Sequence, residues 1–295
     1  MAVEVKRVVR IGGSYYVALP KAWVLENKLE NSYVVVEPES GGVLRLRVLE
    51  GKEAQGPRTA RLVCSGNVLR KILSAYLKGY EVLEVEAEPS CMEELRRVVA
   101  KAQSLLVGLE VVEETPSSVV LQCFTRPDYS VESLLYRMNA VSTSMLEKAA
   151  AALETGDEAL VQEVKSLDDR VDRLYFLVVR LIRSKVADPL TPPEERIRLV
   201  DLRLVARNLE DIADTYESLA SLAPTVRLSL PAHSELADLQ KAAIKEVVDR
   251  RGRADEIRSS LEKLQVRLSE LQPPAVVEEK IRRVVDLLND ILDLV

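Results

Sequence analysis

The feature that most constrains this chain is the helical spacing of its apolar residues from Ser130 to the C-terminus. Two long stripes step by four and three residues: Leu160, Val164, Leu167, Val171, Leu174, Val178 and Leu181, then Leu202, Val205, Leu209, Ile212, Tyr216 and Leu219. Similar stripes follow over 254–271 and 281–295. A helix with such a stripe must bury it against other helices. We therefore expect an all-α bundle of about six helices in this region.

An internal repeat lies within this helical region. Residues 202–214 and 281–293 align without a gap, and both end in Asp-Ile-x-Asp. The repeat predicts two related three-helix units, the second with Asn289 where the first has Glu210. The sequence Thr191-Pro192-Pro193-Glu194 further predicts a capping box at a helix start, with proline in the first helical position.

The N-terminal region has the pattern of short strands. Residues 3–11 alternate with period two and stop at Gly12-Gly13, which predicts a hairpin. A short helix is expected after Pro20, followed by two Val-rich strands at 33–37 and 43–48. A β unit of about 50 residues buries too little to be stable alone, so we expect it to dimerise.

Between these regions, strand-like and helical stretches alternate over residues 58–125, with helices expected near 67–78 and 91–106. This predicts a small α/β domain, with a linker at 51–57 before it and Arg126-Pro127-Asp128 ending it. The predicted fold class is thus multidomain α+β, with domains at 1–52, 57–126 and 128–295.

Composition excludes several classes of protein. No apolar run approaches the ~20 residues of a membrane span, and the N-terminus lacks the pattern of a secretory signal, so we expect a cytoplasmic protein without membrane insertion. The spacing of Cys64, Cys91 and Cys123 fits neither a zinc site nor a disulfide framework, and we interpret all three as buried small hydrophobes. No phosphate loop, nucleophile elbow or histidine-paired nucleophile occurs, which argues against an enzyme.

Charge is distributed unevenly along the chain. The net charge is -6, yet residues 1–50 carry seven Lys and Arg against six Asp and Glu. Residues 128–295 carry 24 basic against 31 acidic residues. Attraction to phosphate groups is therefore expected at the N-terminus and not on the acidic helices.

The segment GGSYYVALPKAWV at 12–24, with the preceding KRVVRI, resembles the SpoVT/AbrB family in its archaeal form. The resemblance covers residues 1–50. It implies a swapped-hairpin arrangement in which each chain supplies a β-barrel half, and binding of double-stranded DNA. By position, it implies that DNA is contacted by Lys6, Arg7, Arg10 and Lys21. Strand alternation places Arg7 on the more apolar face. The alternative is that these are solvated charges on a module that only dimerises.

The helical region carries two carboxylate pairs at four-residue spacing, Asp168-x-x-x-Asp172 and Glu210-x-x-x-Asp214. These pairs match the signature of PhoU proteins, the regulators of phosphate uptake, which the region resembles. Four-residue spacing stacks two carboxylates on one helix face, where they repel, and two such helices together indicate a cation. Oxygen ligands suit magnesium or manganese, and the resemblance implies zinc or iron.

A salt-bridged surface is the alternative to a metal, since Arg173, Arg203 and Arg207 lie within a turn or two of these acids. The second repeat keeps Asp286, Asp290 and Asp293 but lacks the glutamate, so any metal cluster is expected in the first unit.

These observations predict a homodimeric, DNA-binding regulator of phosphate uptake. The second hypothesis is an adaptor that docks on the ATPase of a phosphate transporter, with the N-terminal region serving only for dimerisation.

Overall fold

The structure is a computed structural model that describes residues 5–30, 33–39, 41–48, 57–125 and 129–295. The chain divides into two compact units, Met1–Gly56 and Pro57–Val295. The predicted linker, apart from Pro57, and the predicted boundary at Arg126-Pro127-Asp128 lie outside the described residues.

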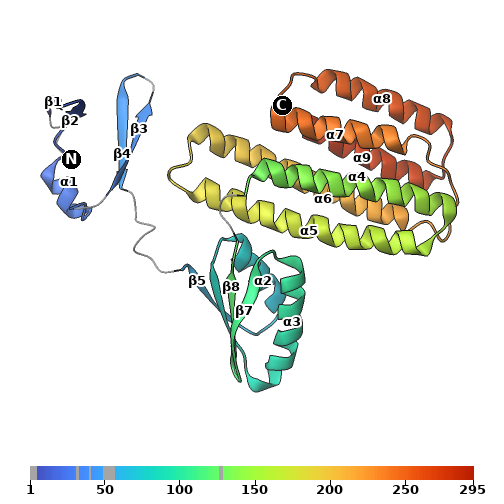
Figure 1. Ribbon diagram of the computed structural model, residues 1–295, viewed down its shortest axis with the longest axis horizontal. Helices are drawn as coiled ribbons and strands as arrows, with labels where there is room; N and C mark the ends of the chain where they lie inside the picture. The colour runs from blue at the N-terminus through green and yellow to red at the C-terminus, as the bar shows by residue number, and fades with distance from the viewer. Residues whose placement is uncertain (1–4, 31–32, 40, 49–56, 126–128) are drawn as a thin grey trace. The chain divides into compact units, whose positions relative to one another are not determined.

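The first unit consists of two hairpins and one short helix (Figure 1). Strand β1 (Val9–Ile11) pairs with β2 (Ser14–Tyr16), helix α1 spans Lys21–Glu26, and β3 (Val34–Glu39) pairs with β4 (Val43–Val48). Both hairpins and the helix after Pro20 are confirmed. The turns depend on glycine, because Gly12 has φ of 61° and Gly41 of 79°. Strand β1 is shorter than the alternation over 3–11 predicts.

The hairpins of the first unit form separate two-stranded sheets that are not closed into a barrel, so the predicted β-barrel half is not confirmed. Leu29 is the single buried hydrophobic residue among the described residues of this unit. The described residues of this unit therefore form no hydrophobic core within one chain.

The second unit begins with an α/β domain built on a four-stranded sheet of order β5-β6-β8-β7. Its strands are β5 (Thr59–Val63), β6 (Val82–Glu86), β7 (Leu109–Thr115) and β8 (Ser118–Cys123). Strands β5 and β6 run parallel, joined through α2 (Val68–Leu77), whereas β8 is antiparallel to both β6 and β7. The 3₁₀ turn η1 (Pro89–Cys91) leads into α3 (Met92–Leu105). Both predicted helices are confirmed, and β7 is an additional strand.

Two of the three cysteines differ from the prediction. Cys64 and Cys91 are half-buried and form a disulfide, and only Cys123 is a buried free thiol. The parallel pairing of β5 with β6 explains the disulfide. Cys64 follows β5 and Cys91 lies just after β6, so both come to the same end of the sheet although 27 residues separate them. Interpreting all three as buried hydrophobes was therefore wrong.

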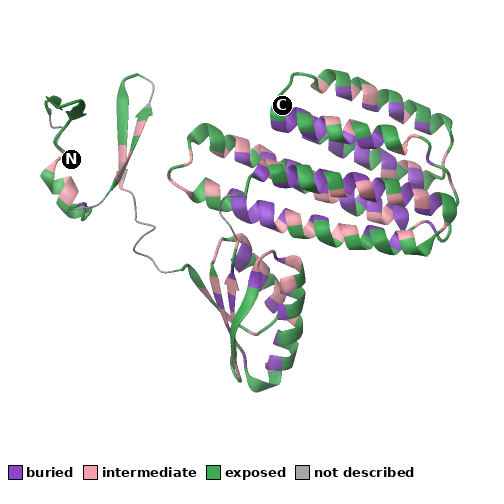
Figure 2. Cartoon of the chain, viewed as in Figure 1, coloured by how far each residue is buried: buried purple, intermediate pink, exposed green. Residues whose placement is uncertain are grey.

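The rest of the second unit is a bundle of six helices, as predicted (Figure 1). They are α4 (Val131–Thr155), α5 (Glu158–Ala187), α6 (Pro193–Ala220), α7 (His233–Asp249), α8 (Ala254–Glu270) and α9 (Ala275–Leu292). Buried side chains run along all six and form one core (Figure 2). The two repeat segments fall on α6 and α9, the third helices of two successive three-helix sets, and these two helices pack together.

Helix α6 starts at Pro193, one residue later than a capping box on Thr191 would place it, and the predicted capping box is wrong. No side chain caps this end, and the Thr191 hydroxyl instead donates a hydrogen bond to the Lys185 carbonyl, at 2.6 Å. Two prolines in succession already fix the backbone there and remove two N–H groups that a cap would have to satisfy.

A buried arginine joins the α/β domain to the bundle. Arg180 of α5 is 5% exposed, and its guanidinium donates to the Tyr76 carbonyl at 2.5 Å and lies over the Tyr76 ring. Phe176 packs against the α/β core, and Leu77 and Val107 pack against the core of the bundle. Within the described residues, no helix combines the length and apolar content needed to cross a membrane.

Candidate functional site

The two predicted carboxylate pairs lie on consecutive, packed helices of the bundle. Asp168 and Asp172 are on α5, and Glu210 and Asp214 are on α6. Each pair flanks an apolar stripe that is buried in the core, including Val171 on α5 and Ile212 on α6. Burying these stripes places the acids of both helices at the margin of the core, half-exposed except for the exposed Asp214.

The tightest part of this cluster includes a residue that the sequence analysis missed. Glu210, Asp211 and Asp214 each offer a carboxylate oxygen, and these oxygens lie within 4.8 Å of one another. Asp168 and Asp172 are not part of this close group, although they interact electrostatically with Asp214 from the neighbouring helix. Asp211 could have been found because it directly follows Glu210 and lies three residues before Asp214.

The carboxylates hold protons more strongly than isolated acids do. Burial, and then the charges of Asp214 and Asp172, raise the pKa of Asp168 to about 7. Burial and Asp214 likewise raise the pKa of Asp172 to about 6 and that of Glu210 to about 7. The pKa of Asp214 is raised by burial and by Asp211. The cluster therefore concentrates negative charge at a place where solvent screens it incompletely.

Positive partners reach only part of the cluster. Arg207 lies 2.7 Å from a Glu210 oxygen and 2.6 Å from Asp211, and Arg283 of α9 lies 4.0 Å from Asp211. The Glu210 oxygen near Arg207, Oε2, is buried and has no well-aligned hydrogen bond among the described residues. Asp168, Asp172 and Asp214 make no ion pair within the described part of the chain.

The salt bridges predicted as the alternative to a metal are formed only in part. Arg207 pairs with the acids as that alternative requires, whereas Arg203 donates to the Tyr175 hydroxyl at 2.8 Å and stacks on its ring. Arg173 lines a separate hollow between α4 and α5. Of the three predicted arginines, only Arg207 therefore pairs with the clustered acids among the described residues, and it reaches two of the five.

The donor set is chemically suited to a hard cation. It consists of carboxylate oxygens, one of them buried and without a hydrogen bond, and a cation would offset the mutual repulsion. The described residues of the second repeat offer no comparable group of acids, and there Arg258 pairs with Asp293 at 2.7 Å.

The predicted DNA-contacting residues all lie exposed in the first unit. Arg10 is on β1 and Lys21 is the first residue of α1, while Lys6 and Arg7 precede β1. The Arg10 guanidinium donates to the Gly12 carbonyl at 3.2 Å. These positions leave the four positive charges accessible from solvent.

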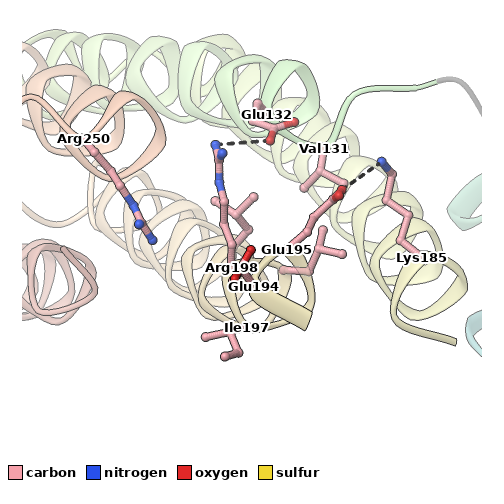
Figure 3. Close-up of a pocket in the computed structure, with 10 residues that line it drawn as sticks. Val131, Glu132, Lys185, Glu194, Glu195, Ile197, Arg198 and Arg250 are labelled. Atoms are coloured by element: carbon pink, nitrogen blue, oxygen red, sulfur yellow. Dashed lines mark ion pairs between the residues drawn. The ribbon is translucent and has the colours of Figure 1, made fainter. Parts of the chain in front are cut away.

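A hollow of about 550 Å³ lies where α4, α5 and α6 meet the end of α7 (Figure 3). Its charged residues largely neutralise one another. Arg198 lies 3.3 Å from Glu132, and Lys185 lies 3.8 Å from Glu195, while Arg250 and Glu194 add one charge of each sign. Because its positive and negative side chains are balanced, this hollow favours neither a cationic nor an anionic ligand.

One known family model matches part of the bundle. The PhoU domain family model matches residues 135–223, which include α5, α6 and the whole acidic cluster. Neither the curated proteins nor the solved structures gave a significant match to this chain.

Proposed function

We propose that this chain regulates phosphate uptake, with a dimeric N-terminal unit that binds DNA and a helical region that binds a metal ion. The observation that carries the proposal is the PhoU domain match over residues 135–223. A phosphate-uptake regulator that binds DNA acts in the cytoplasm, and nothing in the proposed role requires catalysis.

Two properties of the first unit support dimerisation and DNA binding. Its described residues expose many large apolar side chains, such as Ile11, Tyr15 and Val36, and they lack a core. A second copy that pairs with these side chains would supply the missing core, as the resemblance to the SpoVT/AbrB family implies. The exposed charges of Lys6, Arg7, Arg10 and Lys21 would then be presented twice to a DNA duplex.

The proposed metal ligands are Asp168, Asp172, Glu210 and Asp214, with Asp211 added by its position in the close group. Zinc, iron, magnesium or manganese would supply positive charge that offsets carboxylate repulsion and holds α5 to α6. Arg207 would balance the charge that remains on Glu210 and Asp211.

The second candidate function is docking on the ATPase of a phosphate transporter, with the N-terminal unit serving only for dimerisation. The helical region is acidic overall, which disfavours direct contact of the bundle with DNA and favours a protein as the partner of the bundle.

A DNA titration of the full chain separates the two candidates. Fluorescence anisotropy with a labelled duplex at two salt concentrations should show binding that weakens as salt rises. The double variant Arg10→Glu/Lys21→Glu should bind more weakly and with a shallower salt dependence, because phosphate contacts are lost. The matched control Lys245→Glu/Lys263→Glu makes the same change of charge on the bundle and should bind as the wild type does. Equal binding by both variants would favour the adaptor.

A further inference from the structure

A second hollow in the bundle carries charge of one sign only. It lies between α4 and α5, beside the turn that leads from α3 into β7, and has a volume of about 500 Å³. It is lined by Val107, Arg137, Ala140, Val141, Arg170, Arg173 and Leu174. Three arginines are thus its charged residues, and no acid lines it.

No acidic side chain forms an ion pair with these arginines within the described residues. None of the three side chains makes an ion pair or a hydrogen bond there, although the chain as a whole is acidic. Asp169 lies four residues before Arg173, at helical spacing for a salt bridge, yet the two do not pair. Arg137 has only Ser133, Leu134, Ala140 and Val141 at helical neighbour positions. The hollow therefore gathers unneutralised positive charge, which favours an anion.

The chemistry of the lining narrows the class of anion. A guanidinium group binds phosphate through two parallel hydrogen bonds, and several such groups can surround one tetrahedral anion. The apolar side chains of Val107, Val141 and Leu174 form the rest of the wall, which suits the organic part of a small ligand. The volume corresponds to a small molecule and is too small for a folded partner.

The position of Val107 gives the hollow a connection to the α/β domain. The Val107 carbonyl accepts a hydrogen bond from the Tyr76 hydroxyl at 3.1 Å. The Tyr76 ring lies under the guanidinium of Arg180, the buried residue that joins the domain to α5. A ligand in the hollow would thus contact both the bundle and the turn that Tyr76 holds, and would stabilise their junction.

We infer that this arginine-lined hollow is a binding site for a small phosphate-bearing anion, which acts as a signal to the protein. The presence of an anion site rests on the three arginines. The choice of phosphate over other oxyanions rests on the proposed function in phosphate regulation.

Calorimetric titration of the full chain tests the inference. Metal is first stripped with a chelator and the chelator is removed, so that neither metal-bound phosphate nor the chelator contributes. Inorganic phosphate, adenosine monophosphate and sulfate are titrated separately. Saturable binding of phosphate or of the nucleotide is expected, tighter than that of sulfate because the more basic phosphate oxygens accept stronger hydrogen bonds. Tighter binding of the nucleotide would show that an organic phosphate uses the apolar wall, and equal binding would show that the phosphate group alone is recognised.

The variant Arg137→Gln/Arg173→Gln should weaken this binding by at least about tenfold. The control Lys245→Gln/Lys263→Gln removes two exposed positive charges from other helices and should bind as the wild type does. Because the three arginines are exposed and unpaired, the double variant should melt, without ligand, at or above the wild-type temperature.

Absence of saturable binding, or equal binding by the arginine variant and its control, would overturn the site. Equal affinity for sulfate would overturn the selection of phosphate. Failure of the proposed function would look different. The anion would still bind, but the protein would neither bind DNA nor change the ATPase activity of a phosphate transporter.

Discussion

The N-terminal unit and the helical bundle differ in where their apolar side chains go. In the bundle, whole stripes are buried, and Leu209 and Ile212 on α6 are completely inaccessible to solvent. In the described part of the N-terminal unit, comparable residues such as Ile11 and Tyr15 are more than half exposed. Burial of apolar area is the main source of folding free energy, so we expect the bundle to be stable by itself and the N-terminal unit to require a partner.

The largest effect is expected when the two regions are separated. A fragment of residues 1–56 should sediment as a dimer and should unfold on dilution, because in the proposed dimer its core would form only between chains. A fragment of residues 57–295 should keep the helical content and the melting temperature of that region in the full chain. A folded monomer of the 1–56 fragment by sedimentation would contradict the need for a second copy.

Shortening a buried side chain of the bundle tests the same contrast between buried and exposed apolar residues. Leu209→Ala removes a fully buried side chain from the bundle and should lower its free energy of unfolding by about 2–5 kcal/mol. The matched change Leu204→Ala, on the same helix but at a position that is about half exposed, should cost far less. Urea denaturation followed by circular dichroism measures both, and equal costs would show that α6 is not packed as described.

The helical region was more predictable than the rest of the chain because its signal is repeated many times. The two long stripes have seven and six apolar residues at one spacing, and similar stripes mark α8 and α9, so four of the six helices could be placed from their stripes. Helices α4 and α7 were predicted only through the count of about six. Strand β7 gave no such signal, since Leu109 is its one buried residue and glutamates fill much of the remainder. The Cys64–Cys91 disulfide depends on parallel strand pairing, which no local pattern encodes.

The acidic cluster was predictable in its helix spacing and less so in its membership. The i,i+4 pairs placed Asp168 with Asp172 and Glu210 with Asp214 on single helix faces. Glu210, Asp211 and Asp214 approach one another because they are close neighbours on one helix, α6. How closely Asp168 and Asp172 of α5 approach them depends on how the two helices are rotated against each other, which no local pattern encodes. Arg207 alone of the three predicted arginines pairs with these acids, at i,i+3 and i,i+4 spacing on the same helix.

Metal removal is expected to affect the bundle and leave the N-terminal unit unchanged. If the cluster binds a cation, a free concentration of about 100 times its dissociation constant adds about 2.7 kcal/mol, or roughly 5–10 °C in melting temperature. Calorimetry before and after chelation measures this shift, and elemental analysis identifies the ion.

The variant Glu210→Gln/Asp214→Asn separates the metal from the salt-bridge alternative. With metal present it should melt below the wild type, because ligands are lost. Without metal it should melt at or above the wild type, because like charges are removed. No bound metal in the wild type, with an unshifted or raised melting temperature for the variant, would exclude the metal site.

The smallest effect is a pH dependence of the metal-free bundle that runs opposite to the usual behaviour of acidic residues. Asp168 and Glu210 have pKa values of about 7 in the folded chain, well above the ordinary values of 3.8 and 4.5 that apply to the unfolded chain. Between these values the folded state binds more protons than the unfolded state, so the free energy of unfolding falls as pH rises.

The metal-free chain should therefore melt a few degrees higher at pH 5 than at pH 8, and high salt should reduce the difference because the groups are partly exposed. The Glu210→Gln/Asp214→Asn variant should show a flatter dependence, since it removes two carboxyl groups with raised pKa and, with Asp214, a charge that raises the pKa of Asp168. Bound metal should reverse the trend, because protons compete with the cation for the same oxygens at low pH. Melting curves of both proteins at several pH values, with and without metal, measure all three effects. An identical slope for wild type and variant would mean that the acids of α5 and α6 do not interact, and the proposed site would lose its electrostatic basis.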